Sequence, residues 1–230
     1  MSHQNIKIEY SGPIAYLIIN RPEARNALNS ATIAEIKTVL EELRDNSEVG
    51  CVVFTGEGDQ SFASGADINQ LEKKGFLDAL QSGTMQDIYA MIELYEKPTL
   101  AMINGYALGG GCELALATDL RVASTNAKLG FPELNLAVIP GAGGTQRLAR
   151  VVGKGKALEM ILLGKIISAE EALRMGLVNE VVEPEKLRET VETMATQILA
   201  KGPLAVRLAK MAVHYGFDTD LKTGLWLERL

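Results

Sequence analysis

The sequence predicts an α/β protein in which short parallel strands alternate with helices over the first two-thirds of the chain. Two observations support this prediction. The segments 49–54 and 99–104 are short, apolar and free of charged residues, which is typical of strands buried on both faces of a sheet. The segments between such runs carry apolar residues at helical spacing, and most of the chain after residue 150 has a helical pattern.

Length and composition indicate one large globular domain, or one domain with an appendage. The chain has 230 residues, 47% of them hydrophobic, and a chain of this size typically buries about 70% of its unfolded surface. Its net charge of −6 argues against a nucleic-acid backbone as the main partner. With two cysteines and two histidines, we expect reduced core thiols, no disulfide framework and no zinc site.

The longest uncharged run near the middle of the chain is too short and too glycine-rich to be a membrane helix. It covers residues 98–112, whereas a spanning helix needs about 20 apolar residues. The N-terminal ten residues lack the apolar region of a signal peptide. We therefore expect a soluble, cytoplasmic protein without a membrane partner, with an organellar matrix left open as the alternative.

The N-terminal part is expected to be a β-hairpin, a polar loop and a helix. Residues 6–10 and 14–19 predict the two strands, and 20–29 the loop. Thr32 and Glu35 have the spacing of a capping box at the start of the helix. The apolar residues expected on the buried face of this helix are Ile33, Ile36, Leu40 and Leu43.

The middle and the C-terminal part are expected to be strands joined by loops, followed by helices. A second capping box, Ser168 with Glu171, precedes a helix that Gly176 should end. The pattern at residues 225–230 indicates a helix that is cut short. The other expected segments are a loop at 61–68, a helix at 77–96, strands at 120–123 and 177–182, and a loop with a brief strand and a glycine-rich turn at 131–148.

Three consecutive glycines, 109–111, lie between a predicted strand and a short apolar helix. A helix N-terminus presents unpaired N–H donors and partial positive charge, so it can bind a phosphate or stabilise an oxyanion. A tight junction between strand and helix would explain the glycines equally well. The sequence contains no G-x-G-x-x-G, no phosphate-binding G-x-x-x-x-G-K-[ST] and no G-x-S-x-G, which disfavours a dinucleotide fold and a serine hydrolase.

Two glutamates occur in apolar surroundings. Glu113 follows the glycine run among apolar neighbours, and Glu133 lies twenty positions later, after Phe131 and Pro132. A buried carboxylate is costly unless it has a partner or a task. The predicted strand between them could return the chain to the same sheet edge, where the two would form an acid/base pair. For Glu113, a favourable interaction with the helix dipole is the alternative explanation.

The stretch INGYALGGGCELALATDL (103–120) resembles the signature of the enoyl-CoA hydratase/isomerase, or crotonase, superfamily. The resemblance covers nearly the whole chain. The other matching stretches, in the same order, are NRPEARNAL (20–28), FASGADI (62–68), FPELNLAVIPGAGGTQRL (131–148) and ISAEEALRMGLVNEVV (167–182).

The resemblance implies a crotonase-like fold of repeated ββα units with a helical C-terminal trimerisation region. We place the core and active site in residues 1–180 and the helical region, which we expect to be truncated, in 181–230. It also implies an acyl-CoA thioester substrate and a homo-oligomer, either a trimer or a hexamer. No metal and no further cofactor are expected, because coenzyme A is part of the substrate.

The resemblance further implies roles for individual residues. The backbone N–H groups of Ala66 and Gly110 form an oxyanion hole, and Glu113 and Glu133 are the catalytic carboxyls. Arg25 could meet a phosphate of coenzyme A or could be a solvated surface residue. The implied substrate and coenzyme A contacts are Ala24, Arg25, Ala63, Gly65, Asp67, Ile68, Gly109, Pro132 and Gly141. Many relatives carry a lysine where this chain has Asn69, which removes one expected phosphate contact.

Because both glutamates are present, the chain is most similar to the hydratases of the superfamily. We therefore predict syn addition of water across a 2-trans-enoyl-CoA to give a 3-hydroxyacyl-CoA, as in fatty acid β-oxidation. The alternatives are an enoyl-CoA isomerase, a pathway-specific hydratase or dehydratase, and a non-catalytic RNA-binding relative. The length and branching of the acyl chain are not predicted.

Overall fold

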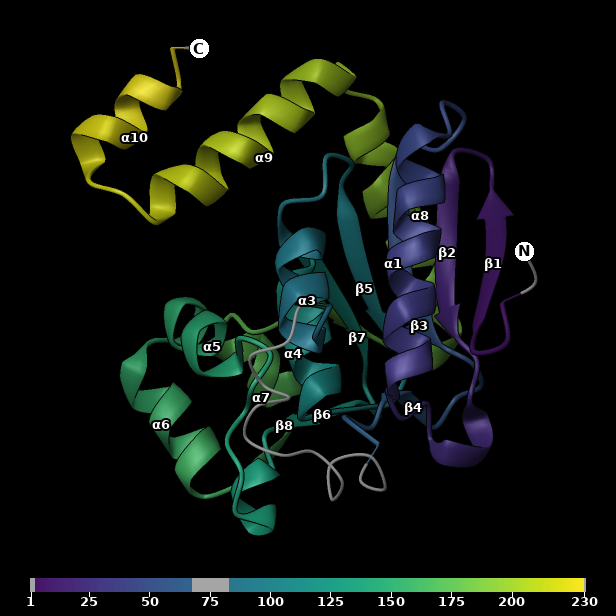
Figure 1. The fold of residues 1–230 in the computed structure, drawn as a ribbon, viewed down its shortest axis with the longest axis vertical. Helices are drawn as coiled ribbons and strands as arrows, with labels where there is room; N and C mark the ends of the chain where they lie inside the picture. The colour runs from purple at the N-terminus through teal and green to yellow at the C-terminus, as the bar shows by residue number, and fades with distance from the viewer. Residues whose placement is uncertain (1–2, 68–82, 230) are drawn as a thin grey trace.

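The computed structural model describes residues 3–67 and 83–229, which form a six-stranded and a four-stranded sheet (Figure 1). The larger sheet has the order β1-β2-β3-β5-β7-β10. Its first two strands are an antiparallel hairpin, as predicted, and the following neighbours are parallel. The strands are β1 Ile6–Ser11, β2 Ile14–Ile19, β3 Cys51–Gly56, β5 Thr99–Ile103, β7 Leu120–Ser124 and β10 Glu180–Val182.

Three strands of the smaller sheet each follow directly, along the chain, after a strand of the larger sheet. Its order is β4-β6-β8-β9, with the first three strands parallel. Thus β3 leads to β4, β5 to β6 and β7 to β8, and β6 continues into helix α4. This repetition confirms the predicted ββα units. The strands are β4 Ser61–Ala63, β6 Tyr106–Leu108, β8 Lys128–Gly130 and β9 Ile166–Ser168.

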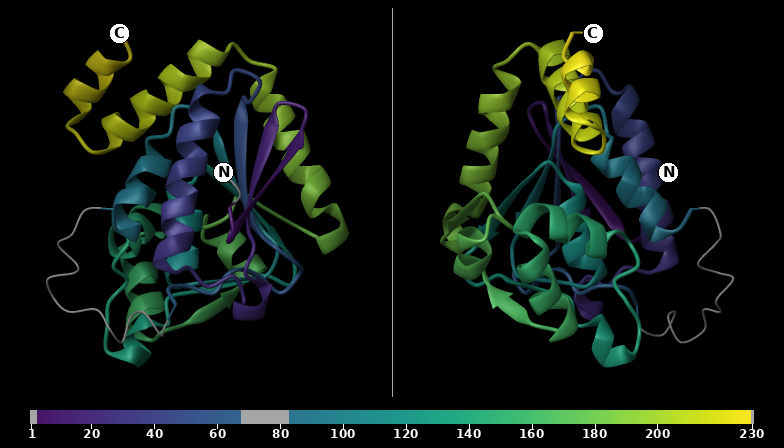
Figure 2. Two further views of the ribbon diagram at one scale, coloured as in Figure 1. Left: turned by 45° about the vertical axis from the view of Figure 1, so that its right-hand side comes forward. Right: turned by 90° about the vertical axis from the view of Figure 1, so that its left-hand side faces the viewer.

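Helices cover both faces of the larger sheet, with α1 and α8 on opposite sides (Figure 2). Because both faces are covered, every residue of β2 and β3 is buried, as the uncharged run at 49–54 indicates. The helices are α1 Ser30–Asp45, α3 Met85–Glu93, α4 Gly110–Ala117, α5 Gly144–Val152, α6 Lys154–Leu162, α7 Ala169–Arg174, α8 Leu187–Leu199, α9 Pro203–Phe217 and α10 Leu221–Leu227.

The predicted capping box at the start of α1 is wrong. The cap is Asn29, whose side chain accepts a hydrogen bond from the Thr32 backbone N–H at 2.7 Å, so Thr32 lies inside the helix. Asparagine is as good an N-cap as threonine, and its position three residues earlier sets the start. Glu35 instead accepts hydrogen bonds from the backbone of Asn5 and Ile6, which ties α1 to β1.

Other expectations about the helices are confirmed. The predicted apolar face of α1 is buried along its whole length. Ser168 and Glu171 form the predicted capping box at α7, and Gly176 follows that helix with a φ of +76°.

The short elements are where the sequence-based expectations fail. The segments containing β4 and β6 were expected to be loops, and β9 falls in a region expected to be helical. The brief strand expected within 131–148 is a 3₁₀ helix, Glu133–Leu136, and the loop at 20–29 contains another, Pro22–Ala24. Strands of three residues are too short to show an alternating pattern. Of the helix expected at 77–96, residues 77–82 lie outside the described part.

The C-terminal helices α9 and α10 extend beyond the sheets, with α10 packed on α9 (Figure 1). Lys210 and His214 of α9 both contact Asp119, at 2.8 and 3.2 Å. The division into regions 1–180 and 181–230 stays a prediction; strand β10 spans that position. No helix in the described part of the chain is long and apolar enough to cross a membrane.

Candidate active site

The candidate site is built around the N-terminus of α4. After β6 the chain turns at Gly109, which has a φ of +50°, and the helix begins at Gly110. Glu113 lies in the first turn with only 2% of its surface exposed. The glycine run therefore starts a helix, as predicted, and this helix carries a buried carboxyl at its N-terminal end.

Two backbone N–H groups, those of Ala66 and Gly110, lie next to each other. A β-carbon placed on Gly110 would be 3.4 Å from the Ala66 nitrogen. Leu28 bonds to the residues on either side of Ala66, donating its N–H to Gly65 and accepting the N–H of Asp67. Within the described part of the chain, neither the Ala66 nor the Gly110 N–H donates to a protein acceptor. This pair can receive the oxygen of a carbonyl group.

Glu113 is held by a loop that precedes α5. Its Oε1 accepts hydrogen bonds from the backbone N–H groups of Ala142 at 2.8 Å and Gly144 at 2.7 Å. Residue 144 must be glycine for this approach, because a β-carbon there would lie 2.8 Å from the same oxygen. Burial raises the pKa of Glu113, and the two N–H groups oppose this rise by favouring the charged form.

Glu133 approaches the same place from the 3₁₀ helix that follows β8. A β-carbon on Gly109 would lie 2.9 Å from its Oε1, so the carboxyl rests against that glycine. Its Oε2 is buried and has no hydrogen-bond partner among the described residues. Burial raises the pKa of Glu133 to about 7, and the charge of Glu113 adds to the rise. The structure thus brings together the two glutamates that the sequence singles out.

Several of the predicted substrate contacts surround these four groups. Ala63 ends β4, and its backbone lies directly against Gly111 at the start of α4. Pro132 immediately precedes Glu133 in the chain, while Gly141 opens the loop that bonds to Glu113. Gly65 and Gly109 are already part of the geometry described above. Ile68 lies outside the described residues.

The remaining predicted contacts lie on the 20–28 loop and beside it. The loop is joined to the segment that carries Ala66 by a hydrogen bond from the Ser64 N–H to the Arg25 carbonyl, at 3.2 Å. The Arg25 side chain is exposed, and Ala24 is partly buried. Asp67 forms an ion pair with Arg21 at 3.3 Å, with both side chains mostly buried. This ion pair connects the loop to the segment that carries Ala66.

The sequence-based analysis missed the groups that hold the site in place. In the sequence, nothing apart from its charge distinguishes Arg21, the partner of Asp67. Tyr89 on α3 donates its hydroxyl to the Gly110 carbonyl at 2.7 Å, and it looked like an ordinary core aromatic. The N–H groups of Ala142 and Gly144 belong to the glycine-rich turn, in which the sequence pointed to Gly141 alone.

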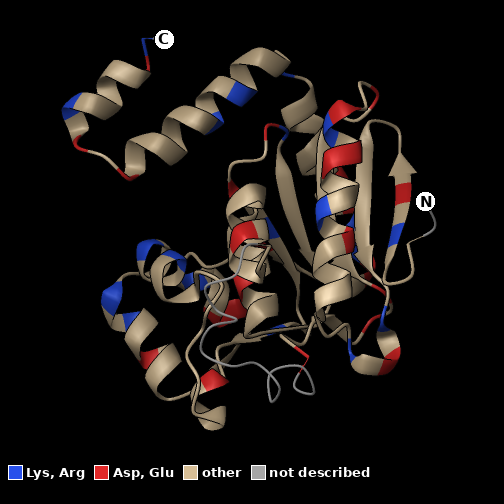
Figure 3. Ribbon diagram, in the orientation of Figure 1, with Lys and Arg blue, Asp and Glu red and all other residues tan. Residues whose placement is uncertain are grey.

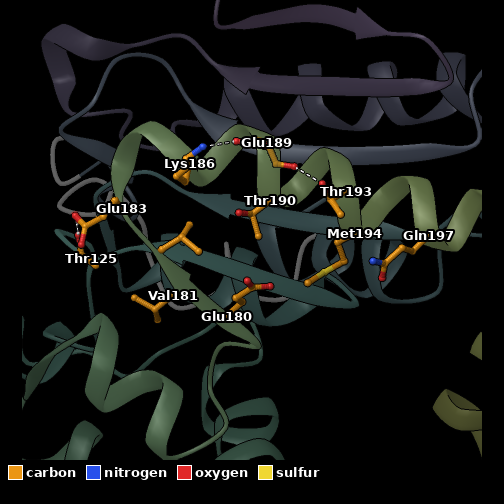
Figure 4. A pocket seen from close by; sticks show the side chains of 11 residues that line it. Thr125, Glu180, Val181, Glu183, Lys186, Glu189, Thr190, Thr193, Met194 and Gln197 are labelled. Carbon is orange, nitrogen blue, oxygen red and sulfur yellow. Dashed lines mark hydrogen bonds and ion pairs between the residues drawn. The ribbon is translucent and has the colours of Figure 1, made fainter.

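A separate pocket of about 690 Å³ lies between α8 and β10 (Figure 4). It is on the face of the larger sheet opposite α4. Two pairs of its polar side chains are in contact: Lys186 with Glu189 at 2.9 Å, and Thr125 with Glu183 at 3.0 Å. In the parts of the chain that the structure describes, no three His, Cys, Asp or Glu side chains are grouped so as to hold a metal ion.

The repeated ββα units of the two sheets place the chain in the crotonase class of α/β folds. The chain belongs to the enoyl-CoA hydratase/isomerase family, whose model matches residues 9–229. It is 46% identical over 229 residues to a crotonyl-CoA hydratase from Syntrophomonas wolfei, covering 99% of this chain and 88% of that protein.

Two further similarities agree with this assignment. A short-chain-enoyl-CoA hydratase from Clostridium acetobutylicum is 44% identical over 229 residues, again 99% of this chain and 88% of that protein. The crystal structure of an enoyl-CoA hydratase from Bacillus anthracis superposes with a TM-score of 0.94 at 40% identity, covering 98% of this chain and 88% of that one.

Proposed function

We propose that this protein is an enoyl-CoA hydratase, which adds water syn across a 2-trans-enoyl-CoA to give a 3-hydroxyacyl-CoA. The observation that carries the proposal is that Glu113 and Glu133 both lie at the N-terminal end of α4, where the backbone N–H groups of Ala66 and Gly110 also lie. Hydration needs a base for water, an acid for the α-carbon and a site for negative charge on oxygen. Family membership and the hydratases among the relatives support the same reaction.

The oxyanion hole would activate the substrate. The thioester oxygen would accept hydrogen bonds from the Ala66 and Gly110 N–H groups, which draws electrons from the conjugated double bond and makes C3 electrophilic. Attack at C3 turns the thioester into an enolate, whose negative oxygen these donors stabilise. One such donor typically contributes about 10²–10³-fold in rate.

The two glutamates would move the protons. Glu113, whose anionic form is favoured by two N–H donors, accepts a proton from water while the hydroxyl adds to C3. Glu133, whose pKa is raised to about 7, keeps its proton to a higher pH than an ordinary glutamate and delivers it to C2. Because the two carboxyls interact, their proton affinities belong to the pair.

We propose that the 20–28 loop holds the coenzyme A part of the substrate. Two observations support this: the loop is bonded to the segment carrying Ala66, and the cationic Arg25 side chain is exposed. Arg25→Gln should raise KM for acyl-CoA severalfold and leave kcat unchanged, because the contact is equal in ground and transition states.

We also propose a trimer or hexamer that needs no metal or added cofactor. Apolar side chains on α9 and α10 are exposed in the single chain, among them Val213 at 69%, Phe217 at 67% and Trp226 at 57%. Such a surface is typical of an interface. Light scattering should show three or six copies, and a fully active monomer would contradict the proposal.

The proposed reaction uses no metal, so activity should survive exhaustive chelation.

The reaction itself is tested by product analysis in ¹⁸O-labelled water with enoyl-CoAs of increasing chain length. A hydratase incorporates one labelled oxygen at C3, whereas an isomerase moves the double bond without incorporating oxygen. Labelled 3-hydroxyacyl-CoA is the expected product. Migration of the double bond alone, or retention of RNA with no turnover, would overturn the proposal.

A further inference from the structure

Arg147 is a basic residue of α5 that points into the protein. Lysines and arginines gather over α5 and α6 (Figure 3), and most of them face solvent. The Arg147 side chain is 13% exposed, compared with 48% for Arg150 and 55% for Lys156. An arginine buried to this degree needs partners, and the partners define what it does.

Its guanidinium joins two elements of the active site. Nε and Nη2 donate to Glu93 Oε2 at 3.0 and 2.6 Å, and Glu93 is the last residue of α3. Nη1 donates to the Ala142 carbonyl at 3.0 Å. Gly143 lies between Ala142 and Gly144 in this loop and has a φ of +102°. A β-carbon on Gly143 would collide with Nη1 of Arg147. The guanidinium therefore lies directly against the 142–144 loop.

The same loop contacts Glu113 with its N–H groups. The N–H of Ala142 donates to Glu113, while the carbonyl of Ala142 accepts from Arg147. One short loop is thus fixed by a cation through its carbonyl and by a carboxylate through its N–H groups. We propose that Arg147, anchored by Glu93, is a positioning residue that acts through the 142–144 loop to hold Glu113 in place as the catalytic base.

The charge of Arg147 also acts on Glu113. The titratable groups that face Glu113 are Arg147 from α5, Glu133 from the 3₁₀ helix, Tyr89 from α3 and its neighbour Cys112. Burial raises the pKa of Tyr89 and of Cys112, so both are neutral at physiological pH. Arg147 is therefore the cation facing Glu113 in the described part of the chain, and it lowers the pKa of Glu113 against the effect of burial.

Arg147→Gln tests the inference, with Arg150→Gln as the matched control. Arg150 is three residues further along the same helix and pairs with exposed Asp218 instead of the loop. In Arg147→Gln, kcat should fall about 10–100-fold through misplacement of the base, with KM for enoyl-CoA nearly unchanged. The acid limb of the kcat/KM profile should move to higher pH, because the base has lost a nearby cation.

Two further variants separate orientation from charge. Arg147→Lys keeps the charge but cannot make the three hydrogen bonds, so it should lose kcat while its acid limb stays at the wild-type pH. Glu93→Gln removes the anchor and keeps the cation, so kcat should fall with no upward shift of that limb. Arg150→Gln should match the wild-type enzyme in both readouts.

The inference rests on the proposed function, and the experiment distinguishes the failure of each. If the wild-type protein does not hydrate any enoyl-CoA, the proposed function fails. If it does, and Arg147→Gln keeps the wild-type kcat or the wild-type acid limb, the positioning role is wrong. A folded Arg147→Lys or Glu93→Gln enzyme with wild-type kcat would overturn the role in the same way, even if Arg147→Gln does not fold.

Discussion

Glu113 and Glu133 lie in one site but have opposite hydrogen-bond surroundings. One oxygen of Glu113 accepts two backbone N–H groups, at 2.7 and 2.8 Å, whereas Glu133 keeps a buried oxygen with no partner among the described residues. Two N–H donors stabilise a carboxylate, and an unpartnered buried oxygen favours the neutral acid. The surroundings therefore assign Glu113 as the base and Glu133 as the acid in the proposed reaction.

Burial disfavours the charged form of Glu133, so the free energy of unfolding should depend on pH. Its folded pKa of about 7 lies above the ordinary value of 4.5, so between these values the folded protein binds more protons than the unfolded chain. The contribution of Glu133 to stability is complete below about pH 4.5 and is lost as the pH rises through about 7. Glu133→Gln removes this loss.

We therefore expect Glu133→Gln to gain stability over the wild-type protein as the pH rises. The gain between pH 5 and pH 8 should be on the order of 1–3 kcal/mol, the upper end being reduced by the partial exposure of the side chain. Urea unfolding at the two pH values measures it. A difference between variant and wild type that does not change with pH would contradict the raised pKa.

Gly144→Ala should displace the base although no catalytic residue is replaced. The added methyl would lie 2.8 Å from Glu113 Oε1 and 2.7 Å from the Phe131 ring, so the loop or the carboxylate must shift. Hydration should fall about 10²-fold, since a displacement of about 1 Å can have this effect. Steady-state kinetics on the folded variant checks it.

Gly155→Ala is the matched control for that substitution. Gly155 lies in α6, and a β-carbon there would meet nothing within 4 Å. It should leave hydration unchanged and stabilise the protein by up to about 1 kcal/mol, because alanine favours the helix. If Gly144→Ala and Gly155→Ala are equally active, the close approach at Glu113 is not needed for catalysis.

The oxyanion hole is tested by removing one donor at Ala66. Leu28 bonds to Gly65 and Asp67 but not to the Ala66 N–H, so Ala66→Pro removes a donor that has no acceptor among the described residues. Turnover should fall at least about 10²-fold. Ala66→Gly keeps the N–H and should retain substantial activity, with some loss from added loop flexibility.

The comparison requires proof that Ala66→Pro folds and binds coenzyme A, which circular dichroism and a binding titration provide. Equal rates of hydration in the folded proline and glycine variants would show that the second donor is elsewhere.

The sequence predicts those parts of the fold that extend over several residues. The buried strands β3 and β5 are continuous uncharged runs, and the apolar face of α1 repeats with helical spacing. The strands β4, β6, β8 and β9 have only three residues each, so no period is visible in them. The expected start of α1 is wrong because the capping-box spacing of Thr32 and Glu35 outweighed the stronger N-cap preference of Asn29.

The site was predictable where a residue type is out of place in its surroundings. Glu113 and Glu133 are charged residues among apolar neighbours, and the resemblance to known hydratases gave them a role. The supporting contacts were not predictable, because Arg147 meets Glu93 across 54 positions and Asp67 meets Arg21 across 46. Such pairs depend on how helices and loops pack, which no local pattern encodes.

The central claim is that two carboxyls hydrate an enoyl-CoA in this site, and turnover of the two glutamine variants tests it most directly. Hydration of a 2-trans-enoyl-CoA should fall about 10²–10⁴-fold in both Glu113→Gln and Glu133→Gln, while the affinity for acyl-CoA stays close to that of the wild-type protein. Glutamine keeps the size and polarity of each side chain and removes its ability to exchange a proton. Near-wild-type turnover in either variant would remove that residue from the mechanism and contradict the account.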